Sequence, residues 1–199
     1  MQYLSQRLAV ESPEARAEER PRGLVAGSQR ERLLAATEAL IAEQGVAATT
    51  IEAIVKQAGV SSVTFYEYFR DKEECFVAAF EQAVGELNDE VRRAVPEDAG
   101  RTDRVRAALA ALLKAIDAEP ARARLCFVEA QKGGRRMRAC YDEALDAAAA
   151  ELGDPLGQGL AGGLAWLLRE RLELGGGGSV QDLLPRMTAV ALSPHPAHG

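Results

Sequence analysis

Two short amphipathic segments meet at Gly59. The first, "TTIEAIVKQAG", opens with hydroxyl side chains, and Thr49 with Glu52 fits the pattern of a capping box, so a helix is expected to about Ala58. Gly59 ends this helix, and Ser61 is placed either to cap the next one or to contact a ligand. Two short helices joined by a tight turn that contains glycine predict a helix-turn-helix.

The second helix of this pair carries many hydroxyl groups, in the stretch "VSSVTFYEYFRDKEE". At about 100° per residue, Phe65 and Phe69 fall on one side of the helix. The opposite arc holds Val63, Thr64, Glu67 and Tyr68. The two aromatic rings can anchor the helix in a small core, and the polar arc then faces outward. For Tyr66 and Tyr68, packing against the preceding helix is the alternative.

Helical spacing continues on both sides of this pair. A preceding helix is expected from Ser28 to Gly45, because apolar residues recur there every three or four positions. Asp71 with Glu74 predicts the start of a long connecting helix that ends before Pro96. Further helices are expected over residues 105–116, 121–131, 135–152, 156–174 and 180–192. No stretch alternates as a strand would, so the predicted fold class is all-α.

Residues 30–80 resemble a known family. The stretch "RERLLAATEALIAEQGVAATTIEAIVKQAGVSSVTFYEYFRDKEECFVAAF" is similar to the N-terminal DNA-binding domain of the TetR family of bacterial transcriptional regulators. The resemblance implies a three-helix helix-turn-helix domain, followed by a helical domain that binds a small-molecule effector of unknown identity and forms a homodimer. It further implies a ligand-responsive regulator, most often a repressor, that binds double-stranded DNA at a palindromic operator.

The resemblance and the helical pattern together predict four parts of the chain. We expect a flexible arm over residues 1–27, the DNA-binding domain over 28–74, the effector-binding and dimerisation domain over 75–192, and a tail over 193–199. The arm is rich in Glu, Arg, Ala and Pro and has no sustained apolar stripe. The resemblance implies that the connecting helix after Asp71 transmits effector binding by changing the spacing of the two DNA-binding domains.

The resemblance assigns two kinds of DNA contact. It places Ser62, Val63, Thr64 and Glu67 toward base edges, where sequence is read. It places Thr50, Tyr66, Tyr68 and Lys72 where the family holds backbone phosphates. Ser61 belongs either to this surface or to the helix cap, and Thr50 has the same alternative. Glu67 departs from the expected pattern, although a carboxylate can accept a hydrogen bond from cytosine N4.

The charge of the chain does not favour nucleic acid. Its formal net charge is -6, and residues 28–72 hold five basic and six acidic side chains, a net of -1. Binding must then depend on positioned contacts: hydroxyls, Lys72 and the backbone N–H groups of helix N-termini. We therefore expect low non-specific affinity and a modest dependence on salt.

The C-terminal helices supply the remaining candidates. The predicted dimer interface consists of Leu160, Leu164, Leu167, Leu168, Leu183, Leu184, Met187 and Val190, with an intramolecular core as the alternative. The predicted effector-binding residues are Phe127, Met137, Tyr141 and Trp166, for which core packing is the alternative. The basic cluster of Arg135, Arg136 and Arg138 either attracts an anionic effector or forms a solvated face.

Several classes of protein are not supported by the sequence. It offers no nucleophile with a usable histidine, no metal-ligand cluster and no phosphate-binding glycine loop, so we expect neither an enzyme nor a metal or cofactor. No apolar run reaches the ~20 residues of a membrane span, and the N-terminus does not resemble a signal peptide, so a cytoplasmic protein is expected. The alternative to a regulator is a dimeric small-molecule-binding or partner-binding protein whose helix-turn-helix does not read DNA.

Overall fold

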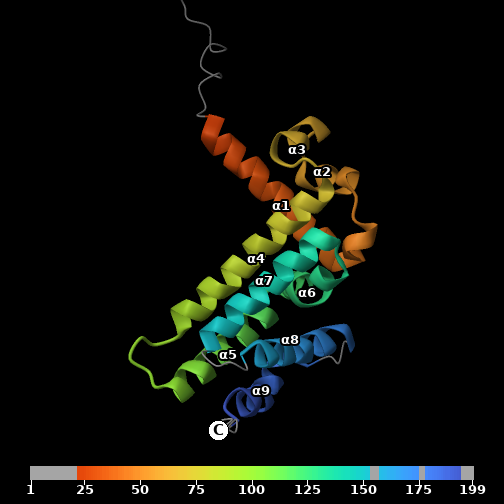
Figure 1. The fold of residues 1–199 in the computed structure, drawn as a ribbon. Helices are drawn as coiled ribbons and strands as arrows, with labels where there is room; N and C mark the ends of the chain where they lie inside the picture. The colour runs from red at the N-terminus through yellow and green to blue at the C-terminus, as the bar shows by residue number, and fades with distance from the viewer. Residues whose placement is uncertain (1–21, 153–156, 175–177, 194–199) are drawn as a thin grey trace, which may run out of the picture.

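The computed structural model describes residues 22–152, 157–174 and 178–193, and all regular structure within these ranges is helical (Figure 1). The predicted all-α class is confirmed. The first helix begins at Arg22, so residues 22–27 are helical and the predicted boundary at Ser28 is too late. Residues 1–21 of the predicted arm and residues 194–199 of the predicted tail lie outside the described residues.

Three helices form the N-terminal part: α1 (Arg22–Ala48), α2 (Ile51–Ala58) and α3 (Ser62–Tyr68). Gly45 interrupts α1 as predicted, with φ 81° and ψ 163°, but one further turn reaches Ala48. Gly59 ends α2 in the left-handed conformation, with φ 63°. A residue with a Cβ is strained at positive φ, which explains glycine at both breaks.

The remaining helices form the body of the molecule. They are α4 (Lys72–Ala94), α5 (Arg101–Ala118), α6 (Pro120–Arg124), the π-helical η2 (Leu125–Glu129), the 3-10 turn η3 (Ala130–Lys132), α7 (Arg135–Leu152), α8 (Gly157–Leu174), the 3-10 turn η4 (Val180–Leu183) and α9 (Leu184–Ala191). The helix predicted over 121–131 therefore changes type twice. None of the described helices has the length and apolar content needed to cross a membrane.

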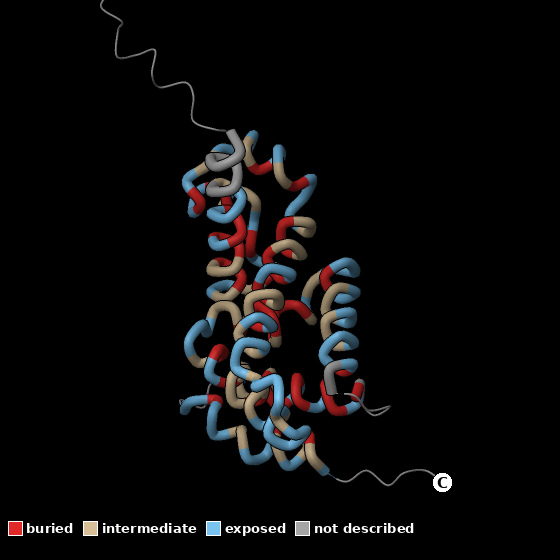
Figure 2. Tube along the Cα trace, turned by 90° about the vertical axis from the view of Figure 1, so that its left-hand side faces the viewer, coloured by how far each residue is buried: buried red, intermediate tan, exposed pale blue. Residues whose placement is uncertain are grey.

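Helix α4 joins the two parts. It packs on α1 at one end and on α5 along its length, with α7 beside it, while α8 and α9 lie at the end far from α3 (Figure 1). The helices turn buried segments toward one another and leave exposed residues outside (Figure 2).

Two apolar clusters hold this arrangement. The first includes Leu33, Phe65 and Phe80 and continues into Leu125 and Met137 of the body. It therefore crosses the predicted domain boundary at residue 74. The second cluster packs α5 against α6, α8 and α9, and the half-buried Leu112 and Phe127 contact both clusters. The N-terminal part thus shares a core with the body.

Candidate nucleic-acid interface

Hydroxyl groups cap both helices of the helix-turn-helix. The Oγ1 of Thr50 accepts a hydrogen bond from the Ala53 N–H (3.2 Å), so Thr50 is the N-cap of α2 and the predicted capping by Thr49 is wrong. The Oγ of Ser61 accepts from the Thr64 N–H (3.1 Å) and shares a second hydrogen bond with the Thr64 hydroxyl (3.0 Å). The capping roles of Thr50 and Ser61 are confirmed, and both residues remain exposed beside α3.

The two faces of α3 differ as predicted. Phe65 and Phe69 are buried in the first cluster, with ring centroids 5.5 Å apart. Val63 is 72% exposed, and Ser62 and Glu67 are also exposed, whereas Thr64 is half-buried. The helix is therefore held from behind by aromatic rings and presents short polar and apolar groups to its surroundings.

The two tyrosines of α3 differ in exposure. Tyr66 is 59% exposed, although its ring meets Phe65 edge-on with centroids 5.5 Å apart. Tyr68 is half-buried against the first cluster, with its ring centroid 6.4 Å from that of Phe69. The expectation that Tyr68 projects away from the core is wrong, because three residues of helix place it only about 60° from the buried Phe65. Tyr66 is the more accessible of the two.

Lys72 lies at the start of α4, close to the corner between α1 and α2. Its Nζ donates a hydrogen bond to the Thr49 carbonyl (3.4 Å) and lies 5.8 Å from the centroid of the Phe76 ring. Lys72 is exposed. Thr50, which directly follows Thr49 in the chain, is exposed as well. The structure therefore brings these two predicted phosphate contacts to one corner of the domain.

Comparison with known proteins identifies this helix-turn-helix. Residues 33–79 match the family described as "Bacterial regulatory proteins, tetR family". The match includes all of α2 and α3 and most of the core that supports them. The helix-turn-helix of this chain is therefore of the TetR type.

Transcriptional regulators also appear among the individual relatives. The transcriptional activator FasR of Mycolicibacterium smegmatis is 31% identical over 121 residues, which are 57% of this chain and 55% of FasR. The chain thus spans about half the length of this curated relative.

Two solved structures share the fold. The fatty acid degradation regulator FadR of Bacillus halodurans has a TM-score of 0.74 at 19% identity, covering 85% of this chain and 97% of that one. FadR of Bacillus subtilis, in complex with stearoyl-CoA, has a TM-score of 0.69 at 17% identity; the match covers 83% of this chain and 99% of that one.

The predicted effector-binding residues do not share one environment. Met137 is buried in the first cluster, and Phe127 lies half-buried between the two clusters. The Tyr141 hydroxyl accepts a hydrogen bond from Gln131 Nε2 (2.9 Å), and burial raises the pKa of this phenol. Trp166 is 52% exposed on α8, so its assignment to the lining of an internal pocket is wrong.

Most predicted dimer-interface residues belong to the core of the protomer. Leu160, Leu164, Leu167, Leu168 and Met187 are buried, and all except Leu160 belong to the second cluster. For these five residues the intramolecular alternative is correct, because α8 packs on α7 and η2 and α9 packs on α5 within the protomer. Leu183, Leu184 and Val190 are only partly buried against that cluster, and their contact with a second copy stays a prediction.

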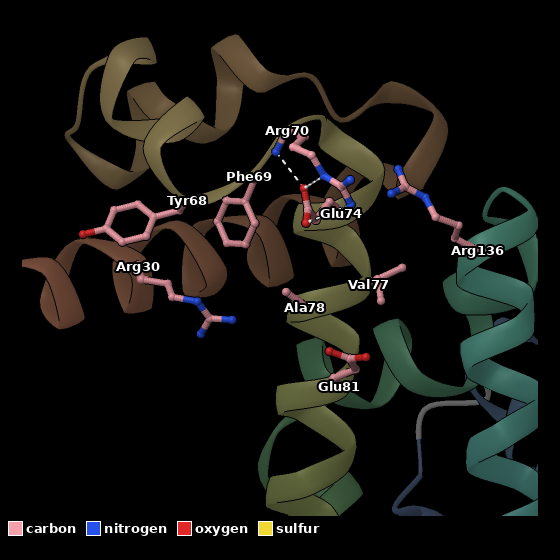
Figure 3. A pocket seen from close by; sticks show the side chains of 9 residues that line it. All are labelled: Arg30, Tyr68, Phe69, Arg70, Glu74, Val77, Ala78, Glu81 and Arg136. Atoms are coloured by element: carbon pink, nitrogen blue, oxygen red, sulfur yellow. Dashed lines mark hydrogen bonds and ion pairs between the residues drawn. The ribbon is translucent and has the colours of Figure 1, made fainter.

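An unpredicted cleft of about 380 Å³ lies below α3, between α1, α4 and the start of α7 (Figure 3). Arg30, Tyr68 and Phe69 line one side, and Arg136 lines the other. Arg136 lies at the mouth of this cleft and belongs to the basic cluster considered above as an anion site.

Arg136 instead pairs within the protein. Its guanidinium contacts both Asp71 carboxylate oxygens (2.7 and 2.8 Å) and the carboxylate of Glu73 (3.2 Å). Asp71 also accepts from the Glu74 N–H (2.8 Å), which confirms its predicted capping role. The capping N–H and then Arg136 lower the pKa of the Asp71 carboxyl. The start of α7 is thereby tied to the residue from which α4 begins.

Sequence reasoning missed the partners of Arg136 and missed Glu129 altogether. Arg136 was recognised as basic, but a single sequence does not show which carboxylates it contacts. Glu129 is buried in η2 and contacts the end of α1. Its signal was present in "LCFVEA", where one carboxylate interrupts an apolar run. Within the described residues, no group of three or more histidine, cysteine or acidic side chains is placed to hold a metal ion.

Proposed function

We propose that this protein is a homodimeric, sequence-specific transcriptional regulator that binds a palindromic operator through α3. The observation that carries the proposal is the outer face of α3, where Ser62, Val63 and Glu67 are exposed while Phe65 and Phe69 fix the helix from behind. An exposed helix with short side chains suits the major groove, and two copies one helical turn apart would read a two-fold symmetric site. Repression is the expected outcome at most such operators.

The corner beside α3 supplies the contacts that orient the domain. Thr50, Tyr66 and Lys72 are exposed there and would hold backbone phosphates, and the N-terminus of α2 adds backbone N–H groups. Arg70 contributes less, because it pairs with Glu74 (3.1 Å). Specific affinity would then depend on a small number of placed groups, with a salt dependence of modest slope.

Replacement of Lys72 tests this function. Fluorescence anisotropy with the DNA that flanks the protein's own gene, at two salt concentrations, should show saturable binding by the wild type. Lys72→Ala should weaken binding to all sequences alike and reduce the salt slope by about one, since one phosphate contact is lost. Lys114→Ala is the matched control, because Lys114 is an exposed lysine on α5, in the body.

The outcomes separate the proposed function from its alternative. If the wild type shows no sequence-selective binding to flanking or other genomic DNA, the domain does not read DNA and a binding protein without operator function is the better description. Equal loss in Lys72→Ala and Lys114→Ala would contradict the proposed docking face. A reporter gene under the operator distinguishes repression from activation.

The effector we propose is a long-chain acyl compound. The support is that the FadR structure from Bacillus subtilis contains stearoyl-CoA and that the similar protein from Bacillus halodurans is a fatty acid degradation regulator. In the same anisotropy assay, stearoyl-CoA should change operator affinity by about 5- to 150-fold, as typical coupling energies imply. Coenzyme A alone is the control, and an unchanged affinity with stearoyl-CoA would exclude this class of effector.

We propose that two copies meet through the outer face of α8. Gly159, Gly163 and Trp166 follow one another at helical spacing on this face and are exposed, which would permit close approach of a second helix. A half-exposed tryptophan is a typical interface residue. The partly buried Leu184 lines an open groove of about 620 Å³ on the neighbouring α9.

Trp166 also provides the test, because it is the only tryptophan in the chain. Trp166→Glu should convert the dimer to a monomer in sedimentation velocity, since a charge would be buried at the contact. In the wild type, dilution should shift tryptophan emission to longer wavelength as the ring becomes solvated. A monomeric wild type, or a dimer unaffected by Trp166→Glu, would place the contact elsewhere.

A further inference from the structure

A buried carboxylate of the body, that of Glu129, contacts the corner between α1 and α2. Glu129, in η2, is 4% exposed. Its Oε2 accepts a hydrogen bond from the Val46 N–H (3.2 Å), directly after the break of α1 at Gly45. Its Oε1 accepts from Lys132 Nζ (3.1 Å) and lies 3.6 Å from Arg124. The charge is thus paired inside the body, and the second oxygen is directed at the backbone of the DNA-binding part.

Gly45 shows how closely the two parts fit. A Cβ at this position would lie 3.1 Å from Glu129 Oε2, and the backbone has a positive φ of 81°. Glycine therefore avoids strain at the positive φ of the corner, and it leaves room for the carboxylate that a Cβ would crowd. A π-helical turn, which is often found at functional sites, carries Glu129.

The corner leads directly to the proposed phosphate contacts. The buried Thr49 hydroxyl donates to the Gly45 carbonyl (2.9 Å), and the Thr49 carbonyl accepts from Lys72 Nζ (3.4 Å). Thr50, which caps α2, follows at the next position. A change in the position of Val46 would therefore move the groups that orient α3 on DNA.

The body side of Glu129 is connected to α7 and α8. Lys132 also pairs with Glu173 (3.3 Å), which pairs with Arg169 (3.2 Å). Arg169 donates to Gln131 Oε1 (2.8 Å), and Gln131 donates to the Tyr141 hydroxyl. A continuous polar network thus joins the helices of the proposed effector domain to the corner.

We propose that Glu129 is a positioning residue for DNA binding: its carboxylate fixes the α1–α2 corner on the body in the orientation in which Thr50 and Lys72 meet phosphate. The proposal rests on the function proposed above. It differs from transmission through α4 alone, since it gives the body a second contact point on the DNA-binding part.

The test compares Glu129→Ala and Glu129→Gln with Leu113→Ala, at a temperature at which all three are folded. Leu113 is fully buried in the second cluster, so Leu113→Ala destabilises the body without touching the corner. Glu129→Ala should weaken operator binding by about 2- to 30-fold, the range seen when coupling residues are changed. Glu129→Gln should recover part of this loss, because its amide oxygen can still accept from Val46, and Leu113→Ala should bind as the wild type does.

Hydrogen exchange provides a readout that does not need DNA. Exchange of the Val46 amide, measured relative to that of Ile54 in α2, should increase in Glu129→Ala and stay constant in Leu113→Ala. An unchanged exchange ratio, or operator affinity equal to that of Leu113→Ala, would overturn the inference. Absence of DNA binding by the wild type would instead defeat the proposed function, so the two failures are distinguishable.

Discussion

Phe65→Ala should lower the free energy of unfolding by about 3–5 kcal/mol, the cost of removing a fully buried phenylalanine side chain. Phe65 is 0% exposed and contacts Phe69 and Tyr66 through ring pairs. Its removal leaves a cavity behind α3, a helix of only seven residues whose stability depends on tertiary packing. Operator binding should therefore be lost at temperatures at which the body remains folded.

Two spectroscopic probes separate loss of α3 from global unfolding. Circular dichroism in a urea titration reports all helices, whereas the fluorescence of Trp166 reports α8. In Phe65→Ala the dichroism should decrease before the fluorescence changes, because the N-terminal part opens first. Val63→Ala is the matched control, since Val63 lies on the same helix but is exposed, and its stability should stay within about 0.5 kcal/mol of wild type. Coincident transitions in Phe65→Ala would show that the two parts unfold as one unit.

The local features of the DNA-binding part could be predicted because their causes are local. Gly59 takes a left-handed conformation that few other residues adopt, and Ser61 and Asp71 cap the helices that follow them. The spacing of Phe65 and Phe69 identified the buried side of α3. In each case the local structure was decided by the residue type and by the residues three or four positions away along the chain.

Features that depend on distant partners could not be predicted in this way. The apolar stripe of Leu164, Leu168 and Met187 shows that a face is buried, but it does not show whether α5 or a second copy covers it. Similarly, Tyr68 lies only about 60° from Phe65 around the helix, a position at the edge of the buried side, where partners outside α3 decide how far the ring is covered. Glu129 was missed because the amide that it binds lies 83 positions away.

Arg122 of α6 forms another contact of this long-range type, with α4. Its side chain is 14% exposed and pairs with Glu86 (2.6 Å) and Glu90 (3.2 Å) of α4. Arg122 also acts electrostatically on Glu38 of α1. Burial raises the pKa of the Glu38 carboxyl above its ordinary value of 4.5, and the positive charge of Arg122 opposes that increase. One guanidinium thus neutralises carboxylates from two helices that connect the DNA-binding part to the body.

Arg122→Met should therefore lower the free energy of unfolding by about 2–3 kcal/mol near neutral pH. Breaking a fully buried pair costs about 3–5 kcal/mol, and the partial exposure of Glu86 and Glu90 reduces that figure. Arg106→Met is the control, because Arg106 makes an exposed contact with Asp103 (3.6 Å) that should contribute little.

The deficit of Arg122→Met should also depend on pH, with a sign fixed by Glu38. A carboxyl whose pKa is raised in the folded state binds protons more readily there, so its contribution to stability decreases as pH rises above 4.5. Removing Arg122 raises this pKa further, since the cation that favours the ionised form is gone. Urea titrations at about pH 7.5 and about pH 5.5 should therefore show a smaller difference from wild type at the lower pH, because Glu38 can then be protonated. A difference that stays constant or grows on acidification would show that the deficit does not depend on Glu38.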